Sequence, residues 1–591
     1  MGRLRFALVA SSAALAALGA STCALADEPK AVITGDMSAD LHAAIERAVG
    51  QSKTAAGSRL EARRRAREAA EDVIAVLDSE GYRDNAVTPD IGEGDKPQPL
   101  VSVVPGQRFT MAGARVTWIG AAPSQDVQTL GVKAIDLADG IPGRAADVLA
   151  AEGRVVSTVQ KKGYADAAAV PREVIADFAD HTLRPEFRIA AGDLVRLDGI
   201  DLRTTGRTNP RWVQQLAPWK EGDVYAPDDV AELERRLLDA GVYDSVTVAL
   251  APKDSMVDGK RPVIVSLADR ARGTIELGAG YSTSEGLGMD GRWLRYNRLG
   301  RADTTTLLFR YAEIERRFEG EISLPHWRKA QTTLKVGAGV FQDETDAYDE
   351  TGLNAHADLT RRYGKTSYRT LGVSLDVTRT DEMLPIPQTR DLITLTGLGA
   401  LSWDKSNDPL DPKRGWRVEA RLEPTSSFGD DTLFYLRGQV QGTAYFPFDD
   451  KGDTVAATRV KLGSVVGVSL ADVPAARRLY AGGGGSVRGY AYQGVGPRLA
   501  NGTPQGGVSL FEASGEIRRR ITDKWGAVVF ADVGAVGDQS APSFSRVSTG
   551  VGAGVRYNLG FGPIRADIAI PVNRRAGDPA YQVYLSIGQS F

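Results

Sequence analysis

The sequence predicts three repeated α+β units followed by a transmembrane antiparallel β-barrel, and three observations support this fold class. The chain begins with an export signal, a glycine–aromatic turn recurs up to residue 272, and residues 273–591 alternate between apolar and polar side chains. After the first 26 residues no long apolar run appears. Any segment of this chain that enters a membrane is therefore expected to do so as strands and not as helices.

The first 26 residues have the parts of a secretory signal peptide. Two arginines precede an apolar stretch at 6–20, and the small residues Ala24 and Ala26 then lead into Asp27. This pattern predicts cleavage between Ala26 and Asp27. The alternatives are a retained membrane helix and a lipid anchor on Cys23. Cleavage is favoured because the apolar stretch is shorter than the roughly 20 residues of a spanning helix and because the residues before Cys23 lack the usual lipoprotein pattern.

The composition disfavours several classes of protein. Cys23 is the single cysteine, so the processed chain would depend on core burial or on a closed hydrogen-bonded sheet instead of disulfides. The formal net charge is −3 with both signs interspersed, and no segment resembles a basic nucleic-acid-binding face. The four histidines lie far apart in the sequence, and no nucleophile elbow or phosphate-binding loop is present. We expect no enzyme activity, no cofactor, no metal and no nucleic-acid partner.

Three helical segments of residues 27–272 end in the same kind of turn, a glycine closely followed by an aromatic residue. These turns are Gly81-Tyr82, Gly163-Tyr164 and Gly241-Val242-Tyr243. They lie 82 and 78 residues apart, and a nearly constant spacing of this kind is typical of structural repeats. Glycine suits the left-handed position after a helix, and the aromatic side chain can pack back on that helix. We therefore predict three α+β domains at 27–106, 107–193 and 194–272.

Residues 273–591 show the period-two alternation of β-strands. In one predicted strand Val551, Val555 and Tyr557 share an apolar face opposite Arg556 and Asn558. Strands of about 9–11 residues with one apolar and one polar face fit lipid outside and a wet lumen inside. A soluble β-sandwich also alternates, but its strands are usually shorter. The export signal favours the transmembrane barrel, in which the acidic segment 343–350 is expected to form an extracellular loop.

Several motifs of the barrel region occur in a fixed order. A glycine run at 482–485 continues into Ser486 and then into Val487, Arg488, Gly489 and Tyr490. On the two strands that follow, the alternation places Glu516 and Asp532 on the inward face. A turn with two prolines, 408–415, precedes these motifs, and the chain ends in an alternating segment that closes with Phe591.

Together these motifs resemble the outer-membrane barrel-assembly and two-partner-secretion superfamily, whose members carry periplasmic POTRA domains before a 16-stranded barrel. The resemblance covers residues 30–591. The 319 residues of 273–591 divided among 16 strands give about 20 for each strand with its turn, a reasonable length. Three POTRA-like domains match the TamA family of autotransporter-assembly factors better than the BamA family, which has five, or the secretion transporters, which have two.

The resemblance implies that the glycine-rich loop folds into the lumen with Val487, Arg488, Gly489 and Tyr490 at its tip. It also implies that Glu516 and Asp532 hold Arg488. This pairing is physically reasonable, because a guanidinium away from bulk water needs fixed carboxylates and an unpaired charge there is costly. The alternative is a solvated arginine on a flexible glycine loop. Arg556 is expected to be one of many wet lumen charges.

The resemblance further implies a cofactor-free factor that inserts or translocates other outer-membrane proteins, autotransporters in particular. TamB, an inner-membrane-anchored periplasmic protein, is the expected partner. POTRA edge strands would capture client segments by strand addition. The first barrel strand (about 274–282) would pair with the last (about 581–591) at a seam. Glycine weakens strands, and the seam residues are Gly278, Gly280, Gly588 and Phe591.

Two other functions remain as alternatives. A passive porin would not need three periplasmic repeats or a loop that fills the lumen. A two-partner-secretion-type polypeptide transporter shares the loop motif, but its two POTRA domains and N-terminal plug helix are not matched. The number of repeats separates this last alternative from an assembly factor.

Overall fold

The computed structural model describes residues 28–93, 97–283, 285–364, 366–383, 387–430, 432–542, 544, 546–558 and 563–587. They form two compact units, the first mainly up to residue 196 and the second mainly from residue 197 onwards. The predicted cleavage site at Ala26 and Asp27 lies outside the described residues, as do Gly588 and Phe591 of the predicted seam. Among the described residues, no helix combines the length and the apolarity needed to cross a membrane.

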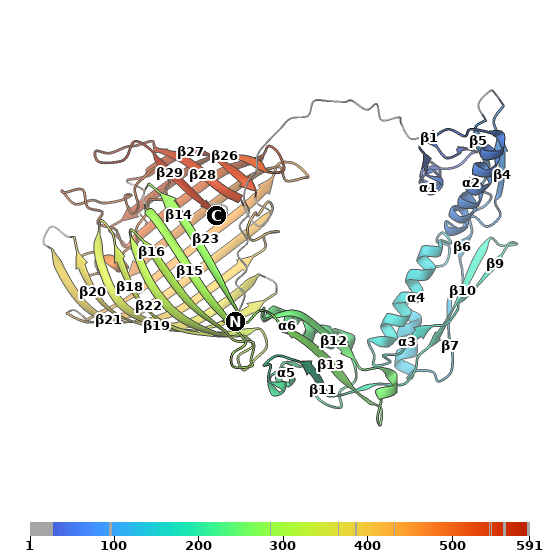
Figure 1. Ribbon diagram of the computed structural model, residues 1–591, viewed down its shortest axis with the longest axis horizontal. Helices are drawn as coiled ribbons and strands as arrows, with labels where there is room; N and C mark the ends of the chain where they lie inside the picture. The colour runs from blue at the N-terminus through green and yellow to red at the C-terminus, as the bar shows by residue number, and fades with distance from the viewer. Residues whose placement is uncertain are drawn as a thin grey trace, which may run out of the picture. The chain divides into compact units, whose positions relative to one another are not determined.

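The first α/β fold packs two helices on a three-stranded sheet (Figure 1). Its elements are β1 (Glu28–Pro29), β2 (Val32–Thr34), α1 (Ala39–Val49), β3 (Gln51–Ser52), α2 (Arg59–Ser79), β4 (Ala86–Ile91) and β5 (Pro99–Val104). The central strand β5 runs parallel to β2 and antiparallel to β4. Ile45, Val73 and Val101 are fully buried in the core between the helices and the sheet. The apolar side of each helix therefore supplies this core.

The second α/β fold also lies in the first unit and is built around one long strand. Its elements are β6 (Thr110–Met111), β7 (Arg115–Trp118), α3 (Gln125–Lys133), α4 (Ala145–Gln160), β8 (Ala168–Ala169), β9 (Glu173–Asp177) and β10 (Thr182–Ala190). β10 is parallel to β6 and β7 and antiparallel to β8 and β9. Val155 of α4 and Phe187 of β10 are fully buried in its core.

The third α/β fold lies mainly in the second unit. Its elements are β11 (Arg196–Thr204), α5 (Pro210–Leu216), α6 (Pro227–Asp239), β12 (Tyr243–Leu250), the short 3-10 helix η1 (Lys253–Ser255) and β13 (Lys260–Asp269). The strand order is β11-β13-β12. Val213, Leu233 and Val265 are fully buried. Each of the three sheets lies within one of the ranges expected from the repeats, whereas the domain boundaries themselves stay a prediction.

The recurring glycines have the backbone conformation that the repeats predict. Gly81, Gly163 and Gly241 have φ angles of 94°, 98° and 71°. After α2, the N–H of Tyr82 donates to the carbonyl oxygen of Leu77 at 2.8 Å, which closes the helix end over the glycine. The spacing of glycines thus marks the ends of three equivalent helices.

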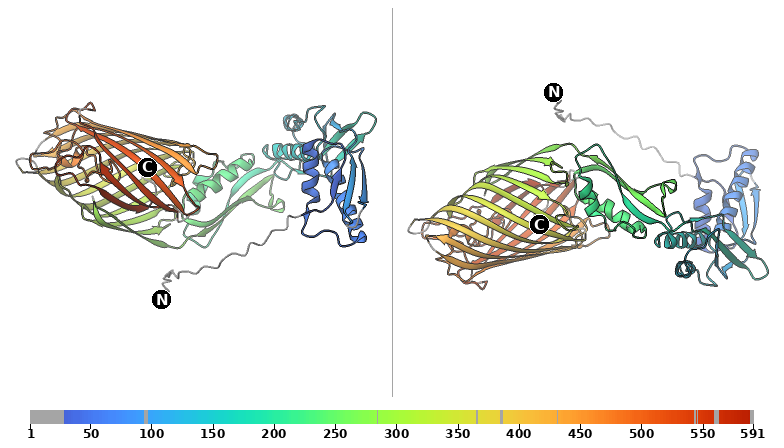
Figure 2. Two further views of the ribbon diagram at one scale, coloured as in Figure 1. Left: turned by 90° about the horizontal axis from the view of Figure 1, so that it is seen from above. Right: turned by 90° about the horizontal axis from the view of Figure 1, so that it is seen from below.

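The second unit also contains a closed barrel in which β14 to β29 pair in sequence order (Figure 2). The strands are β14 (Gly273–Ser282), β15 (Gly286–Tyr296), β16 (Thr304–Ala312), β17 (Glu315–Leu324), β18 (Thr332–Glu344), β19 (Tyr348–Tyr363), β20 (Ser367–Glu382), β21 (Gln388–Asp404), β22 (Gly415–Gly429), β23 (Leu433–Pro447), β24 (Thr454–Val466), β25 (Ser509–Arg520), β26 (Trp525–Gly537), β27 (Ser548–Asn558), β28 (Pro563–Pro571) and β29 (Gln582–Ile587). The described residues therefore form sixteen barrel strands, which confirms the predicted antiparallel barrel and its strand number.

The acidic segment 343–350 is not a loop, and this expectation was wrong. Only residues 345–347 lie outside the strands β18 and β19, which continue the antiparallel ladder as far as Glu344 and Asp349. Glu350 faces inward and is buried. Composition alone misled here, because an acidic residue on the inward face of a barrel strand has the same polarity as one in a loop.

Candidate functional site

The long connection between β24 and β25, residues 467–508, carries the glycine-rich motif and packs against the inner wall of the barrel. Val487 and Tyr490 at its tip are fully buried in an apolar cluster with Val536 of β26. The connection is therefore an ordered part of the barrel interior. We call it the lumen loop.

Arg488 at the tip of the lumen loop is held by both predicted carboxylates. Its Nε and Nη2 atoms donate to the two oxygens of Asp532 at 2.6 and 2.8 Å, and its Nη1 donates to Glu516 Oε1 at 2.7 Å. The backbone N–H of Arg488 also donates to Asp532 at 3.1 Å. The Arg488 side chain is 2% exposed and both carboxylates are fully buried. Bidentate pairing with Asp532 fixes the direction of the loop tip as well as its position.

Burial alone would lower the pKa of the Arg488 guanidinium. Its hydrogen bonds to Asp532 and the charges of Asp532 and Glu516 outweigh that effect, so the pKa of Arg488 is raised above its ordinary value. The guanidinium carbon of Arg488 also lies over the ring of Phe530, 3.4 Å from its centroid. The electron-rich face of an aromatic ring attracts a cation. Arg488 therefore stays charged in its buried position.

The cluster around Arg488 is larger than sequence reasoning suggested. Asp567 of β28 lies 3.6 Å from Arg488 (Oδ2 to Nη1) and also accepts hydrogen bonds from Arg556. Arg556 is 5% exposed, so the expectation that it is a wet lumen charge was wrong. Its partner Asp567 is also buried, with 2% of its surface exposed. Asp567 lies two residues after Arg565 and so falls on the same face of its strand, but this parity does not show which neighbour Asp567 meets.

Glycine allows the loop backbone to approach the barrel wall closely. Gly489 has a φ of 98°, and a Cβ atom added there would lie 2.8 Å from the carbonyl carbon of Ile570. A Cβ atom on Gly550 of β27 would lie 1.8 Å from the carbonyl oxygen of Arg488. Both contacts exclude larger residues, so glycine on the loop and glycine on the wall are each required.

A second arginine, which sequence reasoning missed, holds the glycine run itself. Arg459 of β24 donates to the carbonyl oxygens of Gly485 and Ser486 at 2.8 and 3.1 Å and pairs with Glu512 of β25 at 3.2 Å. The hydroxyl of Ser486 donates to the same carboxylate at 2.7 Å. The only sequence signal was that Arg459 lies on the polar face of its strand.

The first half of the lumen loop is anchored on a different part of the wall. The loop contains the short 3-10 helix η2 (Ala475–Arg477), and the N–H of Ala475 donates to Glu382 of β20 at 2.8 Å. Arg477 lies 3.4 Å from Glu350 of β19, and Arg390 of β21 donates to the carbonyl oxygen of Asp472 at 2.9 Å. The lumen loop thus spans the barrel interior from β19–β21 to β24–β28.

The barrel closes where β14 meets β29. Tyr281 and Ser282 pair with Leu585 and Tyr584, and the N–H of Thr283 donates to the carbonyl oxygen of Val583 at 3.2 Å. Predicted seam residues Gly278 and Gly280 lie on β14. A cavity of about 340 Å³ lies beside this seam and is lined by strand residues and by the glycines of the lumen loop.

The loop tip also reaches the seam. The N–H of Gly489 donates to the hydroxyl oxygen of Tyr584 at 3.1 Å, and a Cβ atom on Gly484 would lie 2.9 Å from the ring of the same tyrosine. Tyr584 is 2% exposed. Tyr584 of the closing strand therefore pairs with β14 across the seam and also contacts the lumen loop.

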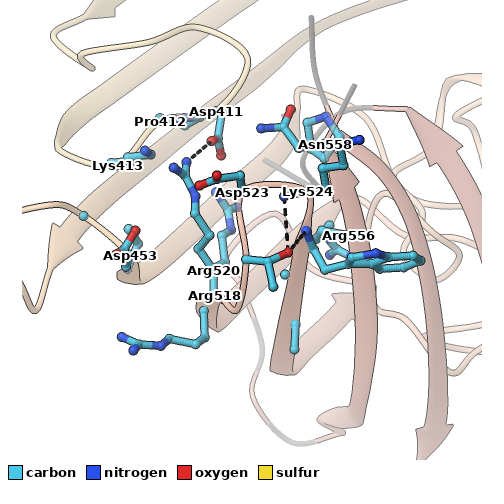
Figure 3. Close-up of a pocket in the computed structure, with 18 residues that line it drawn as sticks. Asp411, Pro412, Lys413, Asp453, Arg518, Arg520, Asp523, Lys524, Arg556 and Asn558 are labelled. Carbon is cyan, nitrogen blue, oxygen red and sulfur yellow. Dashed lines mark hydrogen bonds and ion pairs between the residues drawn. The ribbon is translucent and has the colours of Figure 1, made fainter. Parts of the chain in front are cut away.

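The predicted turn 408–415 forms one side of a basic pocket between the connections of neighbouring hairpins (Figure 3). Its charged lining residues are Lys413, Arg518, Arg519, Arg520, Lys524 and Arg556 together with Asp411, Asp453 and Asp523. Arg520 Nη2 lies 3.9 Å from Asp411 Oδ2. Backbone N–H groups of Leu410 and Asp411 donate to Asp408 and lower the pKa of its carboxyl group. Two of these cations, Arg518 and Arg556, are already paired with Glu516 and Asp567.

Known proteins share both the sequence pattern and the fold. Residues 297–591 match the Omp85 superfamily domain. The chain is 23% identical over 459 residues to the outer membrane protein assembly factor BamA of Neorickettsia risticii (strain Illinois), covering 74% of this chain and 60% of that protein. It is 23% identical over 529 residues to BamA of Neisseria meningitidis serogroup B, covering 74% of this chain and 62% of that protein. The chain therefore spans about three fifths of the length of these curated relatives.

A solved structure has the same fold over most of the chain. The crystal structure of BamA from Haemophilus ducreyi lacking POTRA domains 1-3 superposes with a TM-score of 0.67 at 18% identity. It covers 80% of this chain and 99% of that one. At this identity the likeness concerns the fold.

Proposed function

We propose, from the premise that this chain belongs to the Omp85 superfamily, that it assists the insertion or translocation of other outer-membrane proteins. The protein is an outer-membrane β-barrel whose N-terminal α/β domains are POTRA domains in the periplasm. Two curated relatives are named outer membrane protein assembly factors. The proposal extends that role to this shorter chain.

The anchored lumen loop is the observation that carries the proposal. A passive pore needs an open lumen, whereas this barrel holds a buried loop across its interior by Arg459 and Arg488 on one side and Arg477 on the other. The loop tip contacts Tyr584, next to the residues at which β14 pairs with β29. An opening at that seam would present two strand edges to a client strand while the loop supports the remaining wall.

The second α/β fold offers an edge at which a client segment can first bind. β9 pairs with β10 and lies at the edge of its sheet in the described part of the chain. Val174, Ile175 and Phe178 are exposed on or beside it. An extended client can add its own strand to such an edge. Main-chain hydrogen bonds would then supply affinity, and the exposed apolar side chains would give a preference for barrel sequences.

The finer proposal is that the clients are autotransporters and that a TamB-type protein anchored in the inner membrane is the partner. The three α/β folds ahead of the barrel support this assignment, since their number matches the TamA family pattern. Site-specific photocrosslinkers at Ile175 and at Leu585, with mass spectrometry of the captured proteins, test the two contacts separately. Capture of soluble secreted passengers in place of barrel proteins would instead support a two-partner-secretion transporter.

Reconstitution tests the activity directly. The purified chain in phospholipid vesicles should speed the insertion of an unfolded autotransporter barrel, measured as the appearance of its heat-modifiable folded band. Vesicles that contain the folded barrel with cysteines at Tyr281 and Leu585 joined by a disulfide provide the control for lipid perturbation by the barrel alone. Equal insertion rates in empty vesicles and in vesicles with the wild-type protein would contradict the proposal.

A further inference from the structure

We propose that Glu319, Glu321 and His356 form a binding site for a divalent transition-metal ion, with Zn²⁺ as the natural candidate. One oxygen of each carboxylate and one ring nitrogen of the histidine lie within 4.8 Å of one another. The residues belong to β17 and β19, whereas β24–β28 hold the tip of the lumen loop. The site is therefore separate from the Arg488 cluster and independent of the proposed function.

Strand pairing and a glycine bring these residues together. Glu321 pairs with Gly337 of β18, and Gly337 pairs with His356, so the three positions form one row across three strands. A Cβ atom on Gly337 would lie 2.4 Å from the Cε1 atom of His356. The imidazole therefore occupies the space that any other residue at position 337 would fill. It reaches across β18, with its Nε2 atom 3.6 Å from Glu321 Oε2.

Neighbouring cations leave one carboxylate oxygen of Glu321 facing the histidine. Lys335 Nζ lies 3.2 Å from the other oxygen, Oε1. Arg317 Nη1 lies 3.8 Å from Oε2 of Glu319. These contacts orient the carboxylates, as partners outside the ligand shell do in metal sites. They also add positive charge near the ion, so Lys335 should weaken metal binding.

The donor set and its exposure suit a metal of the zinc class. Imidazole prefers Zn²⁺, Cu²⁺ and Ni²⁺ to Mg²⁺ or Ca²⁺, and zinc often binds three protein ligands with water as the fourth. The three side chains are 16–22% exposed, which leaves room for that water and for entry of the ion. The spacing of the histidines along the sequence did not suggest this site, because its ligands meet only through strand pairing.

An exposed histidine–carboxylate pair elsewhere in the chain provides a matched control. His42 Nδ1 lies 3.6 Å from Glu46 Oε2 on α1, the same separation as in the His356–Glu321 pair, and both side chains are exposed. The barrel site differs from this pair because Glu319 adds a third ligand within reach of the same ion. If a simple ion pair were enough to bind zinc, the two sites would behave alike.

Zn²⁺ titration calorimetry on the untagged full chain in detergent tests the proposal. We expect one saturable site that His356→Ala and Glu321→Gln each weaken at least about tenfold. His42→Ala should leave its affinity unchanged, and Lys335→Met should strengthen it. Gly337→Ala should weaken binding by displacing the imidazole without removing a ligand. Gly442→Ala is its control, since a Cβ atom there meets no atom within 4 Å.

A second measurement separates loss of the site from loss of the fold. Heat-modifiable mobility reports whether each variant remains a folded barrel, and Co²⁺ absorption in the visible region reports the coordination of the bound ion. A Co²⁺ spectrum that His356→Ala abolishes in a folded barrel supports the proposal. The metal-site proposal is overturned if saturable Zn²⁺ binding is absent or if folded His356→Ala binds Zn²⁺ as tightly as the wild type. It is also overturned if His42→Ala loses as much Zn²⁺ affinity as His356→Ala does.

Discussion

The backbone N–H of Gly489 at the tip of the lumen loop donates a 3.1 Å hydrogen bond to the hydroxyl oxygen of Tyr584 on the closing strand. Tyr584 also pairs with Ser282 across the seam. The loop tip, which Arg488 fixes to β25 and β26, is thereby connected to the place where the barrel closes. The loop position and the stability of the seam should therefore depend on each other.

Tyr584→Phe should weaken the closure of the barrel. The substitution keeps the ring but removes the acceptor of the buried Gly489 N–H, and an unsatisfied buried donor costs about 1–3 kcal/mol. We expect the folded band of the barrel to disappear at a lower temperature in a heat-modifiability assay. The control is Tyr281→Phe, because Tyr281 is half exposed on the neighbouring strand. Equal melting of both variants would show that the loop contact does not support the seam.

Arg488→Ala should damage folding and activity far more than Arg421→Ala. Removing Arg488 leaves Glu516 and Asp532 buried without their cation, which costs about 3–5 kcal/mol. Arg421 pairs with Glu423 at 2.6 Å, but its side chain is 56% exposed, and exposed pairs contribute about 0–1 kcal/mol. Urea denaturation and client insertion at matched expression measure the difference. Arg556 is unsuitable as a control, because it belongs to the same buried cluster.

A disulfide across the seam should stop client insertion without unfolding the barrel. Tyr281 and Leu585 face each other in the register of β14 and β29, and both are exposed on the outer face. Cysteines at these two positions, in a chain whose single cysteine is replaced by Cys23→Ser, should form the disulfide on oxidation. Insertion should fail in the oxidised protein and recover on reduction.

A cysteine pair at Leu277 and Leu585 provides the control for this experiment. Leu277 lies four residues from Tyr281 along β14, a separation of roughly 13 Å in a strand, which is beyond the reach of a disulfide. This pair should not crosslink within one molecule and should leave activity unchanged. Full activity of the quantitatively oxidised Tyr281–Leu585 variant would exclude lateral opening as the route of insertion.

The contact between α6 and the barrel turn 325–331 should weaken in acid. His326 Nε2 lies 2.8 Å from the carbonyl oxygen of Arg236, and the N–H of Gln331 donates to His326 Nδ1 at 3.0 Å. These two bonds require a neutral ring with its proton on Nε2. Burial lowers the pKa of His326, with Asp239 and the cations Arg236 and Arg362 as its charged neighbours.

The sign of the pH effect follows from this lowered pKa. The unfolded ring binds protons more readily than the folded one, so the stability from this contact is complete above the unfolded value of about 6.5. It is lost as the pH falls through the lowered pKa of the folded protein. Hydrogen exchange of α6 should therefore be faster at about pH 5 than at about pH 7.5 after correction for intrinsic rates, while exchange of α2 should not change. His326→Gln should remove the pH dependence, and its persistence in that variant would assign the effect to another group.

Local sequence patterns were sufficient for the class of fold and for part of the loop cluster. Alternation with a period of two depends only on which face a residue occupies, so it placed Glu516 and Asp532 inside the barrel before any neighbour was known. The glycines at 81, 163 and 241 marked helix ends because a left-handed cap is a local requirement. The link between Arg488 and its two carboxylates came from the resemblance of the motifs, and the structure brings these groups together.

Which residues of different strands become neighbours was decided only by the tertiary structure. Parity assigns a face but not a register, so the opposition of Tyr281 to Leu585 and the row of Glu321, Gly337 and His356 appear only in the paired sheet. For the same reason the burial of Arg556 was unforeseen. Its burial goes with its pairing to Asp567 of the neighbouring strand, and parity alone does not give that pairing. A strand pattern is local, whereas burial and pairing depend on contacts between distant segments, and those contacts determine the chemistry inside this barrel.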